Sequence, residues 1–327
     1  MNIKAAIIGM GIGQKHFDAI ENYKGAKVEI ICEKDKKKIS QLKKKHPNKV
    51  ITDDQNKIFD NKEINLVSIA SYDNFHFNQI IKAINNNKHI IVKKPMCMKF
   101  SELKKIHTLL NKKKKIKIFS NLVLRVNSLF KDFKKKTNID KVFYIEADYI
   151  WGRKKKLFEW RSKVSDYSLT LGAGIHMIDL IIWITGLNPQ SVYAAGNNKV
   201  TKNTNFKKDS LITMIFEFPK NILVKISANA VADYNHFHEI KIFSKDNTLI
   251  NSNYGAYEIK GNKHKKLDAK YPDKKNRKKL IQNFLDSIKN KNVKPLISVK
   301  EQIDLMTICF AVDRSIKLKK KINIKYL

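Results

Sequence analysis

The chain has 327 residues, which exceeds the usual size of one hydrophobic core, so we expect about two domains. Its formal net charge is +36, but only five of its 66 basic residues are arginine, the residue best suited to guanine edges and phosphates. The lysines are scattered, and no nucleic-acid reading motif accompanies them. This composition argues against a specific nucleic-acid partner and favours a basic surface that concentrates small anions.

The chain shows no sign of membrane insertion or secretion. Its densest apolar stretch, residues 175–184, is about half the length that a bilayer helix needs. An apolar run at residues 5–8 resembles the core of a signal peptide, but glycines follow it in place of a cleavage site. The three cysteines stand far apart, at Cys32, Cys97 and Cys309. This spacing suits a reducing compartment, so we expect a cytoplasmic protein without a membrane span.

The first part of the chain alternates short apolar runs with amphipathic stretches. We predict strands at residues 4–8, 28–32, 50–51, 66–70, 89–92 and 116–119. Helical periodicity lies between them, near residues 13–22, 35–46, 74–87 and 100–112. Almost wholly apolar strands that alternate with helices indicate a parallel sheet covered on both faces. The sequence therefore predicts an α/β domain over residues 1–120.

Beyond residue 120 the pattern changes. We predict a helix near residues 127–136, a strand at 142–150 and an apolar helix at 172–185. Extended runs with short turns follow, at residues 190–197, 209–218, 222–232, 237–244 and 247–251. Two helices close the chain, at about 273–290 and 299–318. This order predicts an α+β domain with an open antiparallel sheet over residues 121–327, whose last helices can pack back on the first domain.

A glycine-rich turn, Gly9-Met10-Gly11-Ile12-Gly13, joins the first predicted strand to the first predicted helix. Glycine there permits a tight turn and lets backbone N–H groups approach a pyrophosphate at the helix N-terminus. The spacing is one residue shorter than G-x-G-x-x-G, so a plain glycine-rich turn of another α/β protein stays possible. In this strand–turn–helix context we predict that the turn binds a nicotinamide dinucleotide.

The second predicted strand ends at Glu33, about 20 residues after the glycine turn, where dinucleotide-binding domains hold an acidic residue. A carboxylate there accepts hydrogen bonds from the adenosine ribose and repels a 2′-phosphate, which favours NAD. Lysines follow at once, at positions 34, 36, 37 and 38, and can tolerate the extra phosphate. We therefore expect NAD, with NADP possible. A solvated strand-end carboxylate is the alternative role of Glu33.

Several further blocks resemble the glucose–fructose oxidoreductase and inositol dehydrogenase family (Gfo/Idh/MocA). Ser68 to His76 resembles its I-A-T-P-N-x-x-H stretch, and Ala83 to Pro95 resembles A-L-x-x-G-K-H-V-x-x-E-K-P. Asn121 and Arg125 resemble the segment that crosses between its domains. Gly174 to Leu180 resembles G-x-H-x-x-D-L. The blocks come in the family's order, and the resemblance covers most of the chain.

The resemblance implies a Rossmann cofactor domain and an antiparallel substrate domain, commonly assembled as homodimers or homotetramers. It implies NAD(P)-dependent oxidation or reduction of a sugar, cyclitol or nucleotide-sugar. Lys94 and His176 then handle the proton, and Asp179, at i+3 from His176, shares its helix face. The cofactor positions implied beyond the glycine turn are Ser71, His76, Lys93 and Lys94. As substrate-binding candidates we take Arg125, His176 and, because aromatic faces and a guanidinium suit rings and phosphates, Trp160 and Arg161. Core packing is an equal reading of the Trp160–Arg161 pair.

Two departures from the family pattern leave other functions open. Lys93 stands where the family has Glu in E-K-P, and Gly172 stands where many members have a catalytic Asp. One alternative is a redox-neutral member that keeps and recycles its NAD. Another is an impaired relative that binds a dinucleotide without net turnover. His236 and His238 alternate on a predicted strand but lack a third ligand nearby, so we expect no metal.

Overall fold

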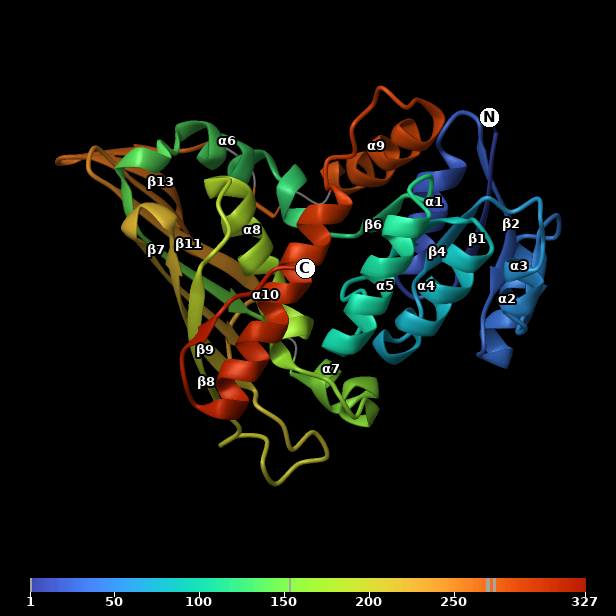
Figure 1. Ribbon diagram of the computed structural model, residues 1–327, viewed down its shortest axis with the longest axis horizontal. Coiled ribbons are helices and arrows are strands. Elements are labelled where there is room, and N and C mark those ends of the chain that lie inside the picture. The colour runs from blue at the N-terminus through green and yellow to red at the C-terminus, as the bar shows by residue number, and fades with distance from the viewer. Residues whose placement is uncertain (1, 153, 269–270, 273–274) are drawn as a thin grey trace. The chain divides into compact units, whose positions relative to one another are not determined.

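The computed structural model describes residues 2–152, 154–268, 271–272 and 275–327. Two compact units make up the chain. Unit 1 comprises residues 1–121 and 275–303, and unit 2 comprises residues 122–274 and 304–327. Each unit is built around one sheet, sheet A in unit 1 and sheet B in unit 2 (Figure 1). Among the described residues, no helix combines the length and the apolar content that crossing a membrane would require.

Sheet A of unit 1 consists of short strands in which most residues are buried. They are β1 (Ile3–Ile8), β2 (Ala26–Cys32), β3 (Val50–Thr52), β4 (Leu66–Ile69), β5 (His89–Val92) and β6 (Ile118–Ser120). All the pairings are parallel, in the order β3-β2-β1-β4-β5-β6. This is the order of a dinucleotide-binding Rossmann sheet, whose ligands bind at the carboxyl ends of the strands. The predicted parallel α/β fold is confirmed.

Helices flank sheet A (Figure 1). They are α1 (Gly13–Glu21), α2 (Lys36–Lys45), α3 (Asn56–Phe59), α4 (His76–Asn85), α5 (Phe100–Lys112) and α9 (Lys278–Lys289). The longer ones bury an apolar stripe, as α4 does with Ile80 and Ile84. Helix α9 comes from late in the chain and packs against α1, where the Tyr23 hydroxyl donates a 2.5 Å hydrogen bond to Asp286. Of the helix predicted at 273–290, residues 273–274 lie outside the described residues.

Sheet B of unit 2 is mostly antiparallel, as predicted. Its strands are β7 (Val142–Ile150), β8 (Ser191–Asn197), β9 (Leu211–Phe218), β10 (Ile222–Asn229), β11 (Phe237–Ser244), β12 (Thr248–Ser252), β13 (Gly255–Lys260), β14 (Lys263–Lys266) and β15 (Ile322–Asn323). Their order is β14-β13-β12-β11-β7-β10-β9-β8-β15. One pair, β7 and β10, runs parallel, and the chain between them forms two helices, α7 and α8, and two strands, β8 and β9.

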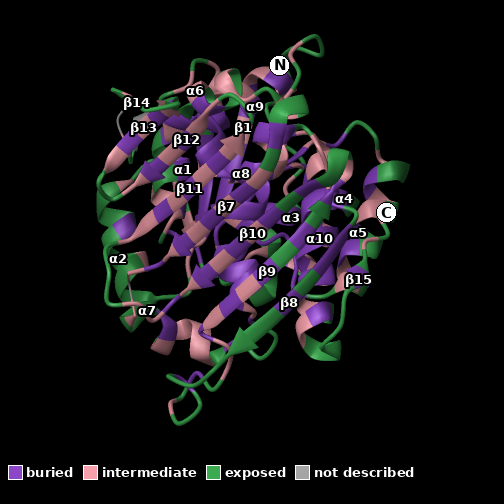
Figure 2. Ribbon diagram, turned by 90° about the vertical axis from the view of Figure 1, so that its left-hand side faces the viewer, coloured by how far each residue is buried: buried purple, intermediate pink, exposed green. Residues whose placement is uncertain are grey.

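The helices of unit 2 are α6 (Ser128–Lys136), α7 (Lys155–Phe158), α8 (Ile175–Thr185) and the later part of α10 (Val299–Leu318). Figure 2 looks onto sheet B from the face opposite α8, and buried and less buried residues alternate along its strands. The helix predicted at 172–185 starts at Ile175, because a π-helical turn, η5 (Thr170–Gly174), precedes it. Gly186, with φ at 69°, ends α8 as predicted.

Candidate functional site

The glycine turn between β1 and α1 is held by close backbone packing. Gly9 has φ at 86° and donates its N–H to the Cys32 carbonyl at 2.8 Å. A Cβ on Gly9 would lie 2.8 Å from the Ala70 carbonyl oxygen, and one on Gly13 would lie 3.0 Å from a methyl of Ile7. The first contact is with backbone and leaves no room for a side chain, whereas the second would require the Ile7 methyl to shift. The first glycine therefore allows the turn, and the last allows α1 to pack on the sheet.

The middle glycine differs from its neighbours. A Cβ on Gly11 would meet nothing within 4 Å, so the turn is open at this point. Met10 and Ile12 flank it, and no side chain caps the start of α1 at Ile12. The start of α1, which carries the positive end of the helix dipole, thus has no side-chain cap, although the Lys15 N–H donates to the Ile12 carbonyl at 3.0 Å. An open, uncapped turn of this kind has room for a pyrophosphate.

The Glu33 carboxylate lies beside this turn, at the end of β2. One of its oxygens accepts a hydrogen bond from the Met10 N–H at 3.0 Å. The other oxygen accepts from the N–H groups of Lys34 at 2.8 Å and Asp35 at 3.3 Å. Glu33 is half-buried, while Lys34 is exposed. The carboxylate is therefore fixed in orientation at the place where a Rossmann domain contacts the adenosine ribose.

Lys93 and Lys94 follow β5 and lie at the carboxyl edge of sheet A. The Lys93 ammonium is 2.9 Å from a carboxylate oxygen of Asp73, which follows β4 and is almost wholly buried. Lys93 and Lys94 are both half-buried. Lys93, which stands where the motif that it resembles has Glu, is thus paired with the Asp73 carboxylate.

His76, at the start of α4, is fully buried, and its ring contacts two backbone carbonyl groups at this edge of the sheet. Its Nδ1 lies 2.6 Å from the Pro95 carbonyl oxygen, and its Nε2 lies 3.2 Å from the Ser71 carbonyl oxygen. Burial, more than any neighbouring charge, lowers the pKa of His76. The Ser71 hydroxyl donates to Gln79 at 2.7 Å. The geometry suits His76 to positioning the Lys94–Pro95 turn more than to touching a cofactor itself.

His16 on α1 is a residue that the sequence reading passed over. Its Nε2 accepts a 3.2 Å hydrogen bond from the Asn121 amide, so its Nδ1 carries the proton and donates to the Ser68 hydroxyl at 2.8 Å. Burial, assisted by the charge of Lys93, lowers the pKa of His16 to about 4. The one available signal was its place three residues after Gly13, on the face of α1 that meets the sheet.

We expect the stability of the protein to fall below neutral pH because of His16. Its pKa is about 4 when folded and about 6.5 when unfolded, so the unfolded state binds more protons between these values. Lowering the pH from 6.5 to 5 should cost about 2 kcal/mol of unfolding free energy through this residue. Urea unfolding at both pH values checks this. His16→Gln should flatten the dependence and His107→Gln should not; equal slopes in all three proteins would contradict the assignment.

In unit 2, five rings meet on the helix-covered face of sheet B. We call them the ring cluster: Tyr149, His176, His236, His238 and Tyr271. The His176 ring stacks on Tyr149 with centroids 5.7 Å apart and planes 10° apart. Tyr149 pairs across the sheet with His238, whose Nδ1 shares a hydrogen bond with the Tyr271 hydroxyl. Among the described residues, no three His, Cys, Asp or Glu side chains form a group able to hold a metal.

His176 is the only half-buried residue in the run from Leu171 to Ile181, while the others of that run are buried. Asp179, one turn on, directs its carboxylate to Arg125 on the 3₁₀ turn η2 (Val123–Val126). The Arg125 Nη2 lies 2.6 Å from one Asp179 oxygen, and its Nε lies 3.0 and 3.2 Å from the two oxygens. Both side chains are buried. Two of the predicted site residues, Arg125 and Asp179, therefore form an internal ion pair.

The turn η5 before α8 is shaped by Tyr167. The Tyr167 hydroxyl lies 1.9 Å from the place that a Cβ on Gly172 would take. Any side chain at 172 would displace this buried phenol, which also packs edge-on against Phe206 at 5.7 Å. Gly172 thus permits the insertion of Tyr167 at the start of the helix that carries His176.

The predicted pair Trp160–Arg161 belongs to a stack of three side chains. The Arg161 guanidinium carbon lies 4.3 Å from the Trp160 ring centroid and 4.7 Å from the Trp151 ring centroid. Its Nη1 donates to the Lys156 carbonyl at 3.1 Å. The guanidinium thus makes cation–π contacts with both indole rings.

Comparison with known proteins matches two models of one oxidoreductase family to this chain. A family model described as an oxidoreductase family with an NAD-binding Rossmann fold matches residues 3–121, and a model described as the GFO/IDH/MocA C-terminal domain matches residues 131–250. An uncharacterized oxidoreductase of Synechocystis is 20% identical over 269 residues, which are 76% of this chain and 71% of that protein.

Solved structures share the fold over the whole chain. Myo-inositol 2-dehydrogenase from Lactobacillus plantarum superposes with a TM-score of 0.85 at 17% identity, covering 99% of this chain and 100% of the other. Scyllo-inositol dehydrogenase from Lactobacillus casei, with bound NAD(H) and scyllo-inositol, has a TM-score of 0.82 at 18% identity and covers 99% of both chains. At these identities the likeness shows the fold.

Proposed function

The chain belongs to the Gfo/Idh/MocA family of NAD-binding oxidoreductases, and from this premise we propose that it transfers a hydride between nicotinamide and a secondary alcohol or ketone carbon of a sugar, cyclitol or nucleotide-sugar. In this proposal residues 1–120 bind the cofactor. Residues 121–327 bind the substrate and mediate oligomerisation.

The observation that carries the proposal is the open middle of the glycine turn. Gly9, Gly11 and Gly13 give a tight, uncapped turn with room at its centre, and Glu33 is fixed beside it. The Asn121 amide oxygen, at the end of β6, is buried without a partner among the described residues, so it can accept a hydrogen bond from a ligand. These features fit a nicotinamide dinucleotide, which supplies the hydride acceptor or donor when bound.

We assign the proton chemistry to Lys94 and His176. Oxidation of an alcohol requires a base for the hydroxyl proton, and reduction requires the matching acid. His176 is half-buried and stacked on Tyr149, so its ring is oriented and still reachable by solvent. The Lys94 ammonium can hydrogen-bond a developing alkoxide. Asp179 and Arg125 we assign to holding η2 against α8 through their ion pair, and His76 and Lys93 to shaping the turn that carries Lys94.

A second candidate is a member that binds NAD without net dehydrogenase turnover, because it is either redox-neutral or impaired. Two observations favour it. Lys93 is engaged with Asp73, and no carboxylate stands at position 172, where the Tyr167 phenol fills the space. Such a protein would bind NADH and show no change in nicotinamide absorbance with any substrate.

We propose that the protein forms a homodimer or homotetramer through the open face of sheet B. Large apolar side chains are exposed on strands of this sheet: Phe143, Tyr193, Ile215 and Leu223. Lone exposed apolar residues are ordinary, but on neighbouring strands they mark an interface. We also propose a cytoplasmic location, since all three cysteines are buried free thiols.

We expect Glu33→Gln to weaken the discrimination against NADPH. The amide keeps an oxygen for the Met10 N–H but removes the charge that repels a 2′-phosphate. The ratio of the NADPH and NADH dissociation constants should fall about tenfold, equivalent to about 1.4 kcal/mol. Fluorescence titration measures both constants. Glu29→Gln, the same change earlier on β2, should leave the ratio alone; an unchanged ratio in Glu33→Gln would remove this role from Glu33.

The hydride-transfer proposal is tested by a substrate screen with NAD and NADP, followed by nicotinamide absorbance. Inositols, hexoses, hexuronates and nucleotide-sugars make up the screen. Turnover with any of them supports the dehydrogenase. Tight NADH binding with no turnover across the screen, in either direction, supports the second candidate instead.

A further inference from the structure

We propose that a cavity of unit 2 binds a small organic molecule through a primary ammonium group, with Asp209 and Asp313 as its counter-ions. The cavity has a volume of about 250 Å³ and is lined from the segment that enters η5, from the chain before and within β9, and from α10. A cavity of about 150 Å³ already holds a molecule of the size of benzene. The cavity is therefore large enough for an organic ligand, and binding there does not require the hydride-transfer function.

The two carboxylates of this cavity have no cation beside them. In the part of the chain that the structure describes, neither Asp209 nor Asp313 forms an ion pair. Lys208 also lines the cavity, but its ammonium donates to the carbonyl groups of Val164 and Ser165. The negative charge of the cavity is thus left without a neighbouring positive charge, in a chain that carries an excess of lysine.

Burial raises the pKa of both carboxyl groups. For Asp313 the pKa rises to about 6, since burial and the charge of Asp209 outweigh the effect of two neighbouring hydroxyl groups. The other titratable groups of the lining are Tyr167, Lys208 and Lys317, of which Lys317 is exposed. At neutral pH the cavity therefore holds negative charge that water solvates only in part, and a bound ammonium compensates this charge.

The Thr170 hydroxyl is an independent sign of a ligand. Thr170 is 1% exposed, lines the cavity and lies beside the Asp313 carboxylate. Its Oγ1 is buried and makes no hydrogen bond of accepted geometry with any described residue. An ammonium donates three hydrogen bonds, and the two carboxylates with this hydroxyl oxygen supply three acceptors.

The rest of the lining favours an organic cation over a metal ion. Leu169, Ile212 and Ile316 line the cavity together with the polar groups. A calcium or magnesium ion takes about six or more oxygen ligands, and no three His, Cys, Asp or Glu side chains come together among the described residues. An alkylammonium instead pairs its charged head with the carboxylates and packs its carbon chain on the apolar side chains.

The Asp209 carboxylate is held in place over β8. A Cβ on Gly196 would lie 2.0 Å from Asp209 Oδ2, so any larger residue at this position would displace the carboxylate. The next residue, Ser210, donates its N–H to the Asn197 carbonyl at 2.9 Å. This bond fixes the chain before β9 to the end of β8, with the carboxylate at the cavity.

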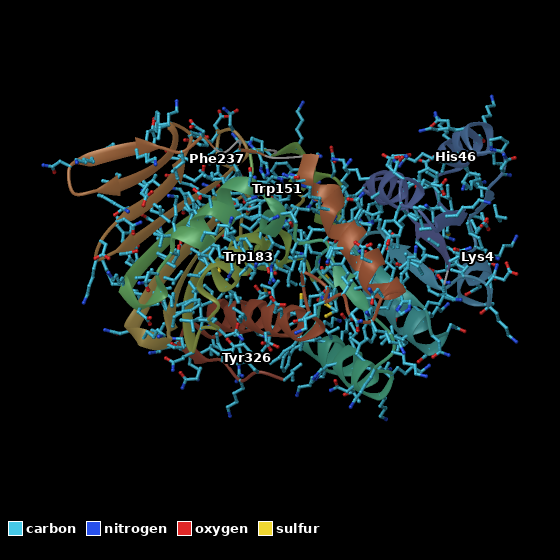
Figure 3. The ribbon with its side chains drawn as sticks, turned by 90° about the horizontal axis from the view of Figure 1, so that it is seen from above. Lys4, His46, Trp151, Trp183, Phe237 and Tyr326 are labelled. Atoms are coloured by element: carbon cyan, nitrogen blue, oxygen red, sulfur yellow. The ribbon has the colours of Figure 1, made fainter. Side chains whose placement is uncertain are left out.

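Helix α10, which carries Asp313, is attached to the same strand. The Ala194 N–H on β8 donates to the Ser315 hydroxyl at 2.9 Å. The tail that follows α10 is tied to the start of this strand. Tyr326, which Figure 3 labels, donates its hydroxyl to the carbonyl of Pro189, two residues before β8, at 2.6 Å. The fold of unit 2 thus brings Asp209 and Asp313 to one cavity without a ligand.

Calorimetric titration of the full chain with n-butylammonium chloride tests the site. At an ionic strength of about 0.15 M, salt screens the field of the surface lysines. We expect saturable binding of n-butylammonium and none of 1-butanol, which has the same carbon chain without the charge. Asp209→Asn and Asp313→Asn should each weaken the binding about tenfold or more, because a charge-assisted hydrogen bond is lost. Both variants should fold, since burial already disfavours the ionised carboxylates.

Asp233→Asn is the matched control, because it removes the same charge from an exposed position of unit 2. It should change the dissociation constant less than twofold. A second measurement needs no variant: the affinity of the wild type should fall as the pH drops below about 6, where Asp313 becomes protonated.

Three results would overturn the proposal. The first is the absence of saturable n-butylammonium binding, and the second is equal binding by the wild type and both cavity variants. The third is binding of Mg²⁺ or Ca²⁺ that the same two variants lose while n-butylammonium does not bind, which would make the cavity a metal site.

Discussion

Replacing Lys94 with Met should lower turnover by about two to four orders of magnitude, the range typical of losing one positioned proton-transfer group. Lys94 is the residue at the carboxyl edge of sheet A that we assign to the developing alkoxide. Methionine keeps the length of the side chain and removes the ammonium. The variant should still bind NADH saturably, because the glycine turn and Glu33, to which most of the binding is assigned, are unchanged.

Steady-state kinetics on the substrate found in the screen, together with NADH titration, measures this result. Lys112→Met is the matched control, since Lys112 is an exposed lysine at the end of α5 in the same unit. It should leave both quantities unchanged. A Lys94→Met protein that turns over at the wild-type rate would remove Lys94 from the chemistry.

Arg125→Met should destabilise unit 2 by about 3–5 kcal/mol, because the buried Asp179 carboxylate would lose the cation that compensates its charge. The Arg125 and Asp179 side chains are 3% and 2% exposed, so solvent cannot replace the lost contacts. Thermal and urea unfolding of the purified variant measure the loss.

The double variant Arg125→Met with Asp179→Leu separates the two explanations of this loss. Removing both charges should recover most of the stability, since an apolar pair of similar volume often equals a buried ion pair. A single variant within about 1 kcal/mol of the wild type would contradict a buried pair. A double variant as unstable as the single one would point to packing in place of charge.

Most of the fold follows from local patterns in the sequence. The strands of sheet A are continuous apolar runs, and Gly186 marks the end of α8 where the structure has it. Elements without such a pattern were missed. Strand β14 (Lys263–Lys266) is exposed throughout, so it has no alternation of apolar residues from which a strand could be predicted. The parallel pairing of β7 with β10, and the place of α9 beside α1, depend on contacts between distant segments that periodicity does not encode.

The candidate site likewise contains residues that the sequence could locate and side-chain contacts that it could not predict. The glycine turn and Glu33 could be located because their spacing is fixed by backbone geometry at one strand end. Side-chain partners could not be found, since each joins separate elements. The pairing of Lys93 with Asp73 links the ends of two strands, and that of Arg125 with Asp179 spans 54 positions. The sequence named Arg125 and Asp179 as site residues without indicating that they bind each other.

The most direct test of the central claim is a titration of the purified protein with NADH and with NADPH, followed by nicotinamide fluorescence. A Gly11→Val variant accompanies it, since a Cβ at this position meets no protein atom within 4 Å and the valine methyls should fill the open middle of the turn. We predict saturable NADH binding, weaker NADPH binding, and a folded Gly11→Val protein that binds neither. If the wild type binds neither nucleotide, or if Gly11→Val binds NADH as the wild type does, the glycine turn is not the dinucleotide site.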